Sequence, residues 1–382
     1  MITVKEVVTK NDYKQFVEFP NQLYRNCNYY LPNYISEEYN LFNPSKNLAY
    51  DYSECNLFLC VDGDKVLGRV ATVINHRYNE EHNVNELRFF KFDVVDNLDV
   101  STALVNKMKN LAIENGLDSI VGTMGFNQFN HYGLLTNGFD NYSIYDAQYN
   151  HEYYINHLLK LNFVKDHEWN SYQITIPNTL DKRVDDITSF ILKKYDLKLV
   201  SVVNVKKNEQ LPDLMAKSIF LRMKNYDYLY SFNTISDKEL NAYSNKFKTI
   251  IQLNSFEMAY YFVITDKNDD VVAFILGIPS IAKLLGKQRF KIMPSLSTVY
   301  KKATTKSDSV DLIGIIVKKE YQNIGLSLIL QNELFKLCKK YDVKYINTDF
   351  DFDLSDVIKK DYQSYDMKLI KTFSSFRFDL IK

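Results

Sequence analysis

The order of the expected secondary-structure elements occurs twice along this chain of 382 residues. In both parts a first strand and a helical region precede a hairpin, an apolar strand that runs into a helix, a further strand, a last helix and closing strands. The first part has expected strands at 2–8, 56–61, 66–75, 86–94 and 119–124, and expected helices at 101–115 and 151–161. The second part has expected strands at 197–205, 259–265, 271–278, 310–317, 344–350 and 368–380, and expected helices at 211–224, 236–249, 326–340 and 354–365. This repetition favours two copies of one mixed α/β unit.

We therefore predict an α/β fold with a mixed sheet in each of two units. The predicted boundaries give an N-terminal half at residues 1–178, a linker helix at 179–195 and a C-terminal half at 196–382. At about 150 residues per domain, the length of the chain agrees with two domains and a linker.

Charge and cysteine content exclude several other classes. Basic and acidic residues both number 47, so the net charge is zero, which argues against bulk binding of nucleic acid. The four cysteines form no Cys-x-x-Cys pair, so neither a disulfide framework nor a structural zinc site is expected. The six histidines show no metal-ligand spacing, so we expect no metal. Because the start lacks a signal-peptide pattern and no apolar run approaches 18 residues, we expect a cytoplasmic protein that does not contact membranes.

The most informative stretch is the apolar strand at 310–317 with the turn and helix that follow it. The turn reads Gln322-Asn-Ile-Gly325-Leu-Ser327. A strand that leads into a helix N-terminus leaves backbone N–H groups unpaired, and the helix dipole adds a partial positive charge there. Gly325 allows the backbone to approach a phosphate closely, and a small residue at 327 keeps that approach open. The pattern indicates an anion site; an ordinary strand–turn–helix connection is the alternative.

The same stretch resembles the GNAT superfamily of acyl-CoA-dependent N-acyltransferases, in which a strand ending in Val precedes [Gln/Arg]-x-x-Gly-x-[Gly/Ala]. Ser327 is a mild departure from that pattern. The resemblance implies that the turn amides hold the pyrophosphate of CoA and that the strand pairs with its pantetheine arm. The implied pyrophosphate turn consists of Gln322, Asn323, Ile324, Gly325, Leu326 and Ser327, and the implied pantetheine contacts are Ile316 and Val317.

Two further residues are catalytic candidates under this resemblance. GNAT proteins often carry Tyr-x-x-x-Gly-Phe on the last helix, where the Tyr protonates the departing CoA thiolate. Tyr362 takes that place here, with Asp366 and Met367 instead of Gly and Phe. A phenol, whose ordinary pKa is about 10, is a suitable weak acid for this step. Asp349, one of three alternating acids at 349–353, is a candidate general base. The alternative for Tyr362 is a half-buried helix tyrosine without a catalytic role, and the alternative for Asp349 is a solvent-exposed aspartate.

The N-terminal half fails the same tests. Leu158 occupies the position equivalent to Tyr362, and the turn after the strand at 86–94 has no glycine. Its acids, Asp96 and Asp99, would repel a pyrophosphate and suit a helix N-cap instead. Glycine is scarce, with 11 in the chain, and the one at 325 falls in the turn that needs it. We therefore expect a CoA site in the C-terminal half alone.

Five of the 11 glycines lie between residues 116 and 138. The runs Gly133-Leu-Leu-x-x-Gly-Phe-Asp140 and Tyr149-Asn-x-x-Tyr-Tyr154 resemble a group of bacterial tandem-GNAT proteins. Two interpretations of this glycine-rich segment stay open. It is either a loop that faces the substrate or a buried turn whose backbone is satisfied by Asn side chains.

The resemblance implies an N-acyltransferase that moves an acyl group, in particular acetyl from acetyl-CoA, to an amine of a small molecule or peptide by direct attack in a ternary complex. Two rivals remain. One is a transferase that takes amino acids from charged tRNA to peptidoglycan precursors, for which a neutral chain is a poor fit. The other is a non-catalytic protein that has kept the fold.

Overall fold

The computed structural model describes residues 1–32, 35–127, 130, 132–142, 144, 148–201, 211–224, 233–242, 245, 260–282, 306–348, 360 and 362–380. The N-terminal half contains β1 (Ile2–Glu6), α1 (Lys10–Leu23), α2 (Ile35–Leu41), η1 (Leu48–Asp51), β2 (Ser53–Asp62), β3 (Lys65–Asn75), α3 (His76–His82), β4 (Glu86–Val94), α4 (Leu98–Glu114), β5 (Ser119–Gly122), β6 (Leu134–Asn137), α5 (Tyr153–Lys160) and β7 (Val164–Thr175). The remainder of the chain contains α6 (Arg183–Lys194), β8 (Lys198–Ser201), α7 (Leu211–Lys224), β9 (Tyr260–Thr265), β10 (Val271–Pro279), β11 (Ser309–Val317), η5 (Lys319–Tyr321), α11 (Leu326–Lys340), β12 (Tyr345–Asn347) and β13 (Met367–Asp379).

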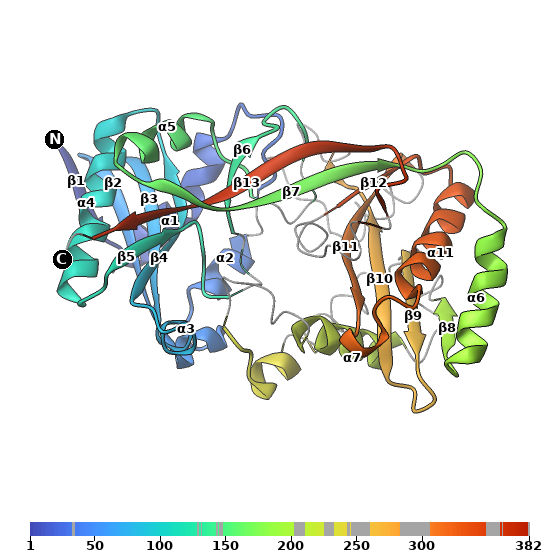
Figure 1. Ribbon diagram of the computed structural model, residues 1–382. Coiled ribbons are helices and arrows are strands. Elements are labelled where there is room, and N and C mark those ends of the chain that lie inside the picture. The colour runs from blue at the N-terminus through green and yellow to red at the C-terminus, as the bar shows by residue number, and fades with distance from the viewer. Residues whose placement is uncertain are drawn as a thin grey trace.

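All described strands belong to one 13-stranded sheet that runs through both halves (Figure 1). Its order is β1-β2-β3-β4-β5-β13-β7-β12-β11-β10-β9-β8, and β6 pairs with β13. Two neighbouring pairs are parallel, β4 with β5 and β11 with β12, and the other pairs are antiparallel. Because the same order of strands occurs on both sides of β7 and β13, the predicted repeat of a mixed α/β unit is confirmed. The boundaries at 178 and 196 stay predictions.

The two halves share their central strands. β13, at the end of the chain, pairs with β5 through Phe376–Asp379 and with β7 along most of its length. β7 in turn pairs with β12 through Gln173–Thr175. The strand beside β5 therefore comes from the C-terminal end of the chain, and the strand beside β12 comes from the N-terminal half. Figure 1 shows β7 and β13 as a long antiparallel pair that crosses from one half to the other.

Each half has a core on both faces of the sheet. In the N-terminal half, α4 and α5 cover one face with residues such as Leu104 and Leu158, and α1 covers the other with Phe16. In the C-terminal half, α11 packs Ile329 and Leu334 on one face, and α7 packs on the other. Both faces of β9 are buried, in agreement with its continuous apolar sequence.

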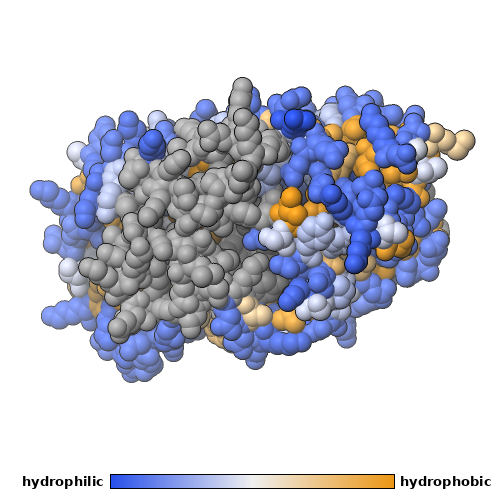
Figure 2. Space-filling view, turned by 180° about the vertical axis from the view of Figure 1, so that it is seen from behind, coloured by the Kyte–Doolittle hydropathy of each residue, from blue (hydrophilic) through white to orange (hydrophobic). Residues whose placement is uncertain are grey.

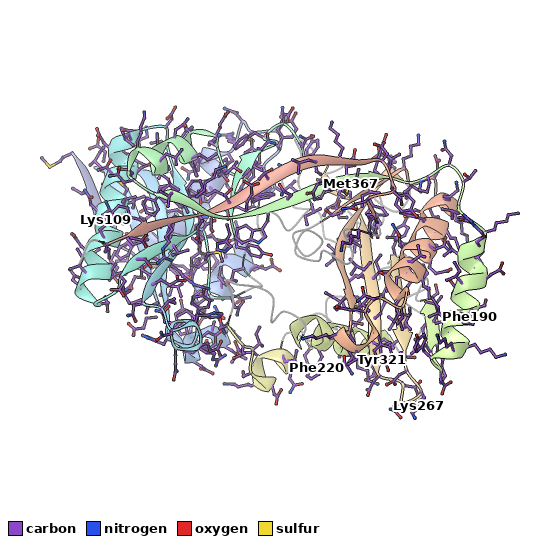
Figure 3. All side chains as sticks on the ribbon, viewed as in Figure 1. Lys109, Phe190, Phe220, Lys267, Tyr321 and Met367 are labelled. Atoms are coloured by element: carbon purple, nitrogen blue, oxygen red, sulfur yellow. The ribbon has the colours of Figure 1, made fainter. Side chains whose placement is uncertain are left out.

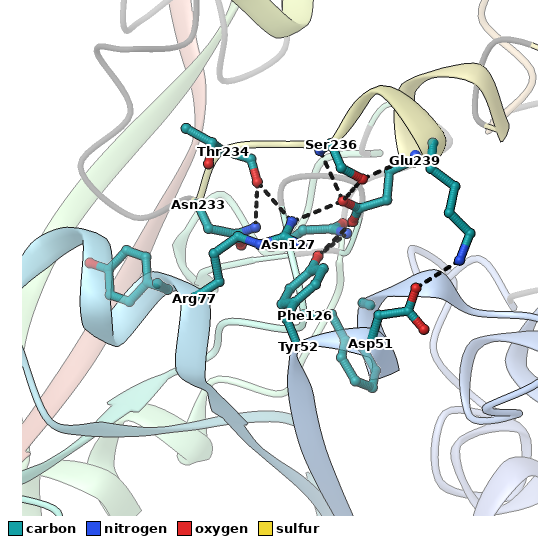
Figure 4. A network of polar contacts seen from close by, with 12 residues as sticks. Asp51, Tyr52, Arg77, Phe126, Asn127, Asn233, Thr234, Ser236 and Glu239 are labelled. Carbon is teal, nitrogen blue, oxygen red and sulfur yellow. Dashed lines mark hydrogen bonds and ion pairs between the residues drawn. The ribbon is translucent and has the colours of Figure 1, made fainter.

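A second connection between the halves lies away from the shared strands (Figure 4). Glu239, which is buried, accepts hydrogen bonds from the Tyr52 hydroxyl (2.8 Å) and from Arg77 Nη1 (2.9 Å) of the N-terminal half. The Arg77 guanidinium stacks over the Tyr52 ring at 3.7 Å, and Asn75 donates to Asn233 at 2.9 Å. A buried carboxylate is tolerated when charged and neutral donors satisfy it, so this network fixes residues 233–242 against the N-terminal half.

The surface seen from behind is largely hydrophilic over the described residues, with small separate hydrophobic patches (Figure 2). None of the helices in the described ranges is both long and apolar enough to cross a membrane.

Candidate functional site: a splayed strand and an open helix start

β11 separates from its parallel neighbour after three residues. The pairing runs from Ser309↔Tyr345 to Asp311↔Asn347, and β12 ends there, whereas β11 continues to Val317. On its other side β11 pairs with β10 as far as Ala273↔Val317, with a register shift that leaves Ile313 as an extra residue. Such a bulge bends a strand and increases its twist. Within the described residues, the β12 side of β11 therefore has no strand partner beyond Asp311.

The backbone of Val317 faces that open side. The N–H of Lys318 donates to the carbonyl of Val272 in the strand β10 at 2.8 Å, so it points toward β10. Successive residues of a strand present their backbone groups to opposite sides, so the N–H and C=O of Val317 point toward the gap. Gln322 Nε2 donates to the Val317 carbonyl at 3.3 Å, which ties the following turn to the end of the strand.

The turn ends in a helix start that no side chain caps. Gly325 is the N-cap of α11. Because glycine has no side chain, it cannot accept a hydrogen bond from the first N–H groups of the helix. Its φ of 94° lies in the left-handed region that favours glycine, and a Cβ there would come within 2.9 Å of Ile191 Cδ1. The first turn of α11 contains no acidic residue. The N-cap residue thus supplies no side-chain acceptor to the first N–H groups of this 15-residue helix, and the helix dipole favours an anion beside them.

The predicted binding residues gather at this turn. Tyr321, which precedes Gln322, lies at the lower end of the C-terminal half, and Met367, where β13 starts, lies at the upper end (Figure 3). Asn323 is exposed with a φ of 63°, whereas Leu326 and Ser327 are buried at the start of α11. Ile324 packs against the core beneath α11. These six consecutive residues form the turn and the start of α11, and their binding of a pyrophosphate stays a prediction.

Ile316 and Val317 lie on opposite faces of β11. Val317 is buried in the cluster that α11 covers, whereas Ile316 is half-buried and packs with the cluster that contains Met215 of α7 and Phe274 of β10. Side chains alternate along a strand, so only one of these two side chains can face any one ligand, although the backbone of both borders the gap.

Tyr362 lies away from the turn, at the middle of α11. It is fully buried, and its ring meets Phe335 edge-on at a centroid distance of 6.4 Å. Phe335 stands ten residues after Gly325, roughly 15 Å along the helix. The structure therefore separates Tyr362 from the predicted pyrophosphate turn by about the length of three helical turns. Asp349, the candidate base, lies outside the described residues.

A carboxylate that the sequence reasoning missed stands where the two strands separate. Asp311 is fully buried and occupies the last paired position of β11. Its Oδ1 accepts a hydrogen bond from Asn347 Nδ2 at 2.9 Å, and Gln173 Nε2 donates to Asn347 Oδ1 at 3.0 Å. Val310 and Leu312, its neighbours, pack under α11, so Asp311 faces the opposite side of the sheet. The signal in the sequence was a single acidic residue within an otherwise apolar strand.

The equivalent strand of the N-terminal half is closed. β4 has nine residues like β11, pairs with β5 from Glu86↔Ser119 to Phe89↔Gly122, and ends at Val94, the counterpart of Val317. The N–H of Val94 donates to the Tyr154 hydroxyl at 3.0 Å, and the Tyr153 hydroxyl donates to the Val94 carbonyl at 2.6 Å. Two side chains of α5 thus occupy the backbone groups that face the gap in the other half.

The helix start of the N-terminal half is also occupied. Asn97 is the N-cap of α4, and its side chain accepts the N–H of Asp99 at 2.9 Å. The sequence pattern pointed to Asp96 or Asp99 as the N-cap. The N-cap is instead Asn97, because it is the residue immediately before Leu98, the first residue of α4. The absence of a CoA site from this half stays a prediction.

The glycine-rich segment is, where it is described, a buried turn satisfied by Asn side chains. Asn130 Oδ1 accepts the N–H of Phe126 at 2.8 Å, and Asn150 Oδ1 accepts the N–H of Leu135 at 2.7 Å. This outcome favours the second of the two interpretations of the segment. In the described parts of the chain, no group of three His, Cys, Asp or Glu side chains is arranged to hold a metal ion.

Comparisons with known proteins identify the architecture. No family model matches the chain. Protein YghO of Escherichia coli (strain K12) is 21% identical over 331 residues, which cover 84% of this chain and 80% of that protein. A tandem GNAT protein from the clavulanic acid biosynthesis pathway superposes with a TM-score of 0.53 at 8% identity, over 99% of this chain and 98% of the other. A glucosamine N-acetyltransferase region of a fungal multi-domain β-N-acetylglucosaminidase gives a TM-score of 0.51 at 12% identity, over 99% of this chain and 38% of that one. The chain has a tandem GNAT fold.

Proposed function

We propose that this tandem GNAT protein is an acyl-CoA-dependent N-acyltransferase whose donor, in particular acetyl-CoA, binds in the C-terminal half. The single observation that carries the proposal is the conjunction at the end of β11: the strand loses its parallel neighbour after Asp311, and the turn that follows opens into a helix start with no capping side chain. The first feature leaves backbone groups for an amide-bearing chain, and the second leaves N–H groups for a phosphate.

Each part of the donor has a partner in this arrangement. The N–H groups from Gly325 to Ser327 would bind the pyrophosphate, where Gly325 brings the backbone close. The backbone of Val317 would pair with the amides of the pantetheine arm, which then lies along β11 toward Asp311. No phosphate-binding side chain is required at the helix start, because the amides and the dipole supply the positive potential.

The chemical step needs one base and one acid. Asp311 would accept a proton from the attacking amine, directly or through water, as the amine nitrogen bonds to the thioester carbon. The tetrahedral intermediate then collapses with cleavage of the C–S bond, and Tyr362 would give a proton to the thiolate. Asp349 remains a second candidate base. Because the amine attacks the bound thioester directly, no covalent enzyme intermediate forms, and positioning supplies much of the rate.

The acceptor is an amine of a small molecule or peptide. Nucleic acid is a poor candidate because the chain has no net charge. The tRNA-dependent alternative predicts turnover that requires charged tRNA, and the non-catalytic alternative predicts binding without turnover.

The proposal is tested by calorimetric titration of the whole protein with acetyl-CoA, free CoA and a longer acyl-CoA. We expect a single site per chain with a dissociation constant in the micromolar range, and failure to bind at millimolar concentration would overturn the proposal.

Turnover is then followed by release of free thiol with a panel of amines. Tyr362→Phe should lower kcat by about 100-fold and leave acetyl-CoA binding unchanged if its hydroxyl acts as the acid. Tyr154→Phe is the matched control, because Tyr154 is also a fully buried helix tyrosine but belongs to the closed half. Equal kcat values for both variants would remove Tyr362 from the mechanism while leaving the binding proposal intact.

A further inference from the structure

The helix α6 carries exposed apolar side chains at the outer end of the C-terminal half, on the side of α11 that faces away from the N-terminal half (Figure 1). Phe190, which Figure 3 labels at this edge, is 64% exposed, and Ile187, one helical turn before it, is 42% exposed. Lys194 Nζ lies 5.7 Å from the centre of the Phe190 ring, a contact that leaves most of the ring in water. Single exposed apolar residues are common on proteins, so the residues around these two decide what the face can bind.

The opposite face of α6 holds the helix against the body of the protein. Ile191 is buried in the core that α11 covers. Asp185 accepts hydrogen bonds from Lys336 Nζ at 2.6 Å and from Asn332 Nδ2 at 3.1 Å, both on α11. These contacts fix the rotation of α6 about its own axis. The exposed apolar side chains are therefore presented to the outside by a helix that cannot turn them into the core.

The exposed face of α6 has opposite charges at its two ends. Asp186, Phe190 and Lys193 are spaced i, i+4 and i+7, so they form one stripe along the helix, and all three are exposed. In the part of the chain that the structure describes, neither Asp186 nor Lys193 has an ion-pair partner. Asp185, by contrast, is paired with Lys336. The stripe thus consists of an available acid, an aromatic ring and an available base, in that order.

Such a stripe is complementary to a second copy of itself. When two α6 helices lie antiparallel about a two-fold axis near Phe190, Asp186 of each copy lies opposite Lys193 of the other. A two-fold axis generates every contact twice, so this one pair of residues gives two ion pairs. The Phe190 rings meet between them, where both are removed from water. An anionic partner such as a lipid surface fits less well, because Asp186 would repel it.

We propose that the protein forms a symmetric dimer in which the exposed faces of two α6 helices pack antiparallel. One pair of helices buries less than a standard interface of about 1,600 Å², so we expect a weak dimer with a dissociation constant on the order of 10 µM. The dimer does not depend on the proposed acyl-CoA site, because no residue assigned to that site belongs to α6.

Sedimentation velocity of the whole protein tests the proposal, at concentrations from about 1 to about 200 µM that bracket the expected dissociation constant. The wild-type protein should change from monomer to dimer over this range. Asp186→Lys and Lys193→Asp should each weaken association by at least about tenfold, because each homodimer then contains two pairs of like charges. An equimolar mixture of these two variants should dimerise again, because every charged contact between them joins a lysine to an aspartate.

A second pair of variants tests the apolar part of the interface. Phe190→Ser should weaken association by at least about tenfold, because the ring supplies most of the apolar area at the centre. Ile113→Ser is the matched control, because Ile113 is also 64% exposed but lies on α4 in the N-terminal half, and it should leave association unchanged.

Three results would overturn the proposal. A wild-type protein that stays monomeric throughout would show that the face binds something other than a second copy. A dimer that survives both charge reversals would use another surface. Charge variants that stay monomeric when they are mixed would exclude the antiparallel pair of helices.

Discussion

β4 and β11 are equivalent strands of the two halves of the molecule. Both have nine residues, both leave a parallel neighbour after a few pairs, and both end in a valine whose backbone faces the resulting gap. At Val94 the hydroxyls of Tyr153 and Tyr154 fill that gap, whereas at Val317 the described contact is with Gln322 of the turn. The comparison teaches that the sheet alone does not decide whether such a gap is filled. In the N-terminal half, two side chains of α5 fill it.

The helices that follow these two strands also differ in their N-caps. The Asn97 side chain accepts an N–H group at the start of α4, whereas Gly325 supplies no side-chain acceptor at the start of α11. In the N-terminal half these polar groups are satisfied by the half's own side chains, whereas under the proposed function those of the C-terminal half bind the donor. The predictions below test this division, beginning with the largest expected effect.

The sharpest test compares two buried aspartates. Asp93 accepts hydrogen bonds from Arg69 Nε at 2.7 Å and from the Tyr24 hydroxyl at 2.9 Å. Asp93→Asn should lower the free energy of unfolding by about 3 kcal/mol, because it removes the charge of the closer of the two carboxylates that pair with the buried Arg69 guanidinium. Asp311→Asn should cost less stability but lower kcat by about 100-fold with unchanged acetyl-CoA binding.

Denaturant unfolding and thiol release, measured on both aspartate variants, check this pair. If Asp311→Asn lost stability as Asp93→Asn does and kept its turnover per folded molecule, the carboxylates of the two halves would have the same structural role and the division would fail.

The helix starts are compared by a pair of single changes. Gly325→Glu should weaken acetyl-CoA binding by at least about 100-fold, because it places a side chain and a negative charge where the pyrophosphate would lie and forces a left-handed conformation on a non-glycine residue. Asn97→Ala should cost about 1 kcal/mol of stability through loss of the N-cap and leave binding unchanged. Calorimetric titration of both proteins decides; equal affinities would contradict an anion site at Gly325.

The pH dependence of stability compares a paired with an unpaired buried cation. Arg69 is paired with Asp93, whereas the pKa of Lys371 falls from 10.5 to about 7 on burial. Between these values the lysine is protonated in the unfolded chain and neutral in the folded chain, so the contribution of Lys371 to stability rises with pH. From pH 7 to pH 9 the wild-type protein should gain roughly 2 kcal/mol over Lys371→Met in chemical denaturation. Parallel curves for the two proteins would show that Lys371 keeps an ordinary pKa.

The smallest expected effect concerns the tyrosines that close the N-terminal gap. Tyr154→Phe removes the hydroxyl that accepts the N–H of Val94 and contacts the Tyr24 hydroxyl at 2.8 Å. Stability should fall by about 1 to 2 kcal/mol, because a buried N–H is left unpaired, and the stoichiometry of acetyl-CoA binding should stay at one per chain. Binding of a second molecule would show that this hydroxyl alone keeps the N-terminal site shut.

Much of the fold could be predicted from periodicity. The helix expected at 326–340 and the strand expected at 86–94 have those bounds in the structure, because apolar spacing and a clear stop define them locally. The exchange of β7 and β13 could not be predicted in this way. Which strand lies beside β5 depends on pairings between residues more than 200 positions apart, about which a local pattern carries no information.

The site was predictable in part. The turn from Gln322 to Ser327 stood out because glycine is scarce and position 325 requires it. Asp311 was missed because one acid in an apolar strand gives no periodic signal. The missing glycine led us to expect no CoA site in the N-terminal half, and that stays a prediction. The filling of its gap by Tyr153 and Tyr154 gave no signal in the sequence and could be recognised only once α5 and β4 were seen in contact.

The place of β13 in the sheet also has a consequence for the order of events during synthesis. A ribosome releases the N-terminal half first, yet the edge of β5 stays uncovered until residues 367–379 leave the exit tunnel. An uncovered edge can pair with a foreign strand, so the nascent chain is most exposed to aggregation throughout the translation of its second half. Residues 367–379 therefore complete the sheet of the N-terminal half, and a chain terminated before them leaves both halves unfinished.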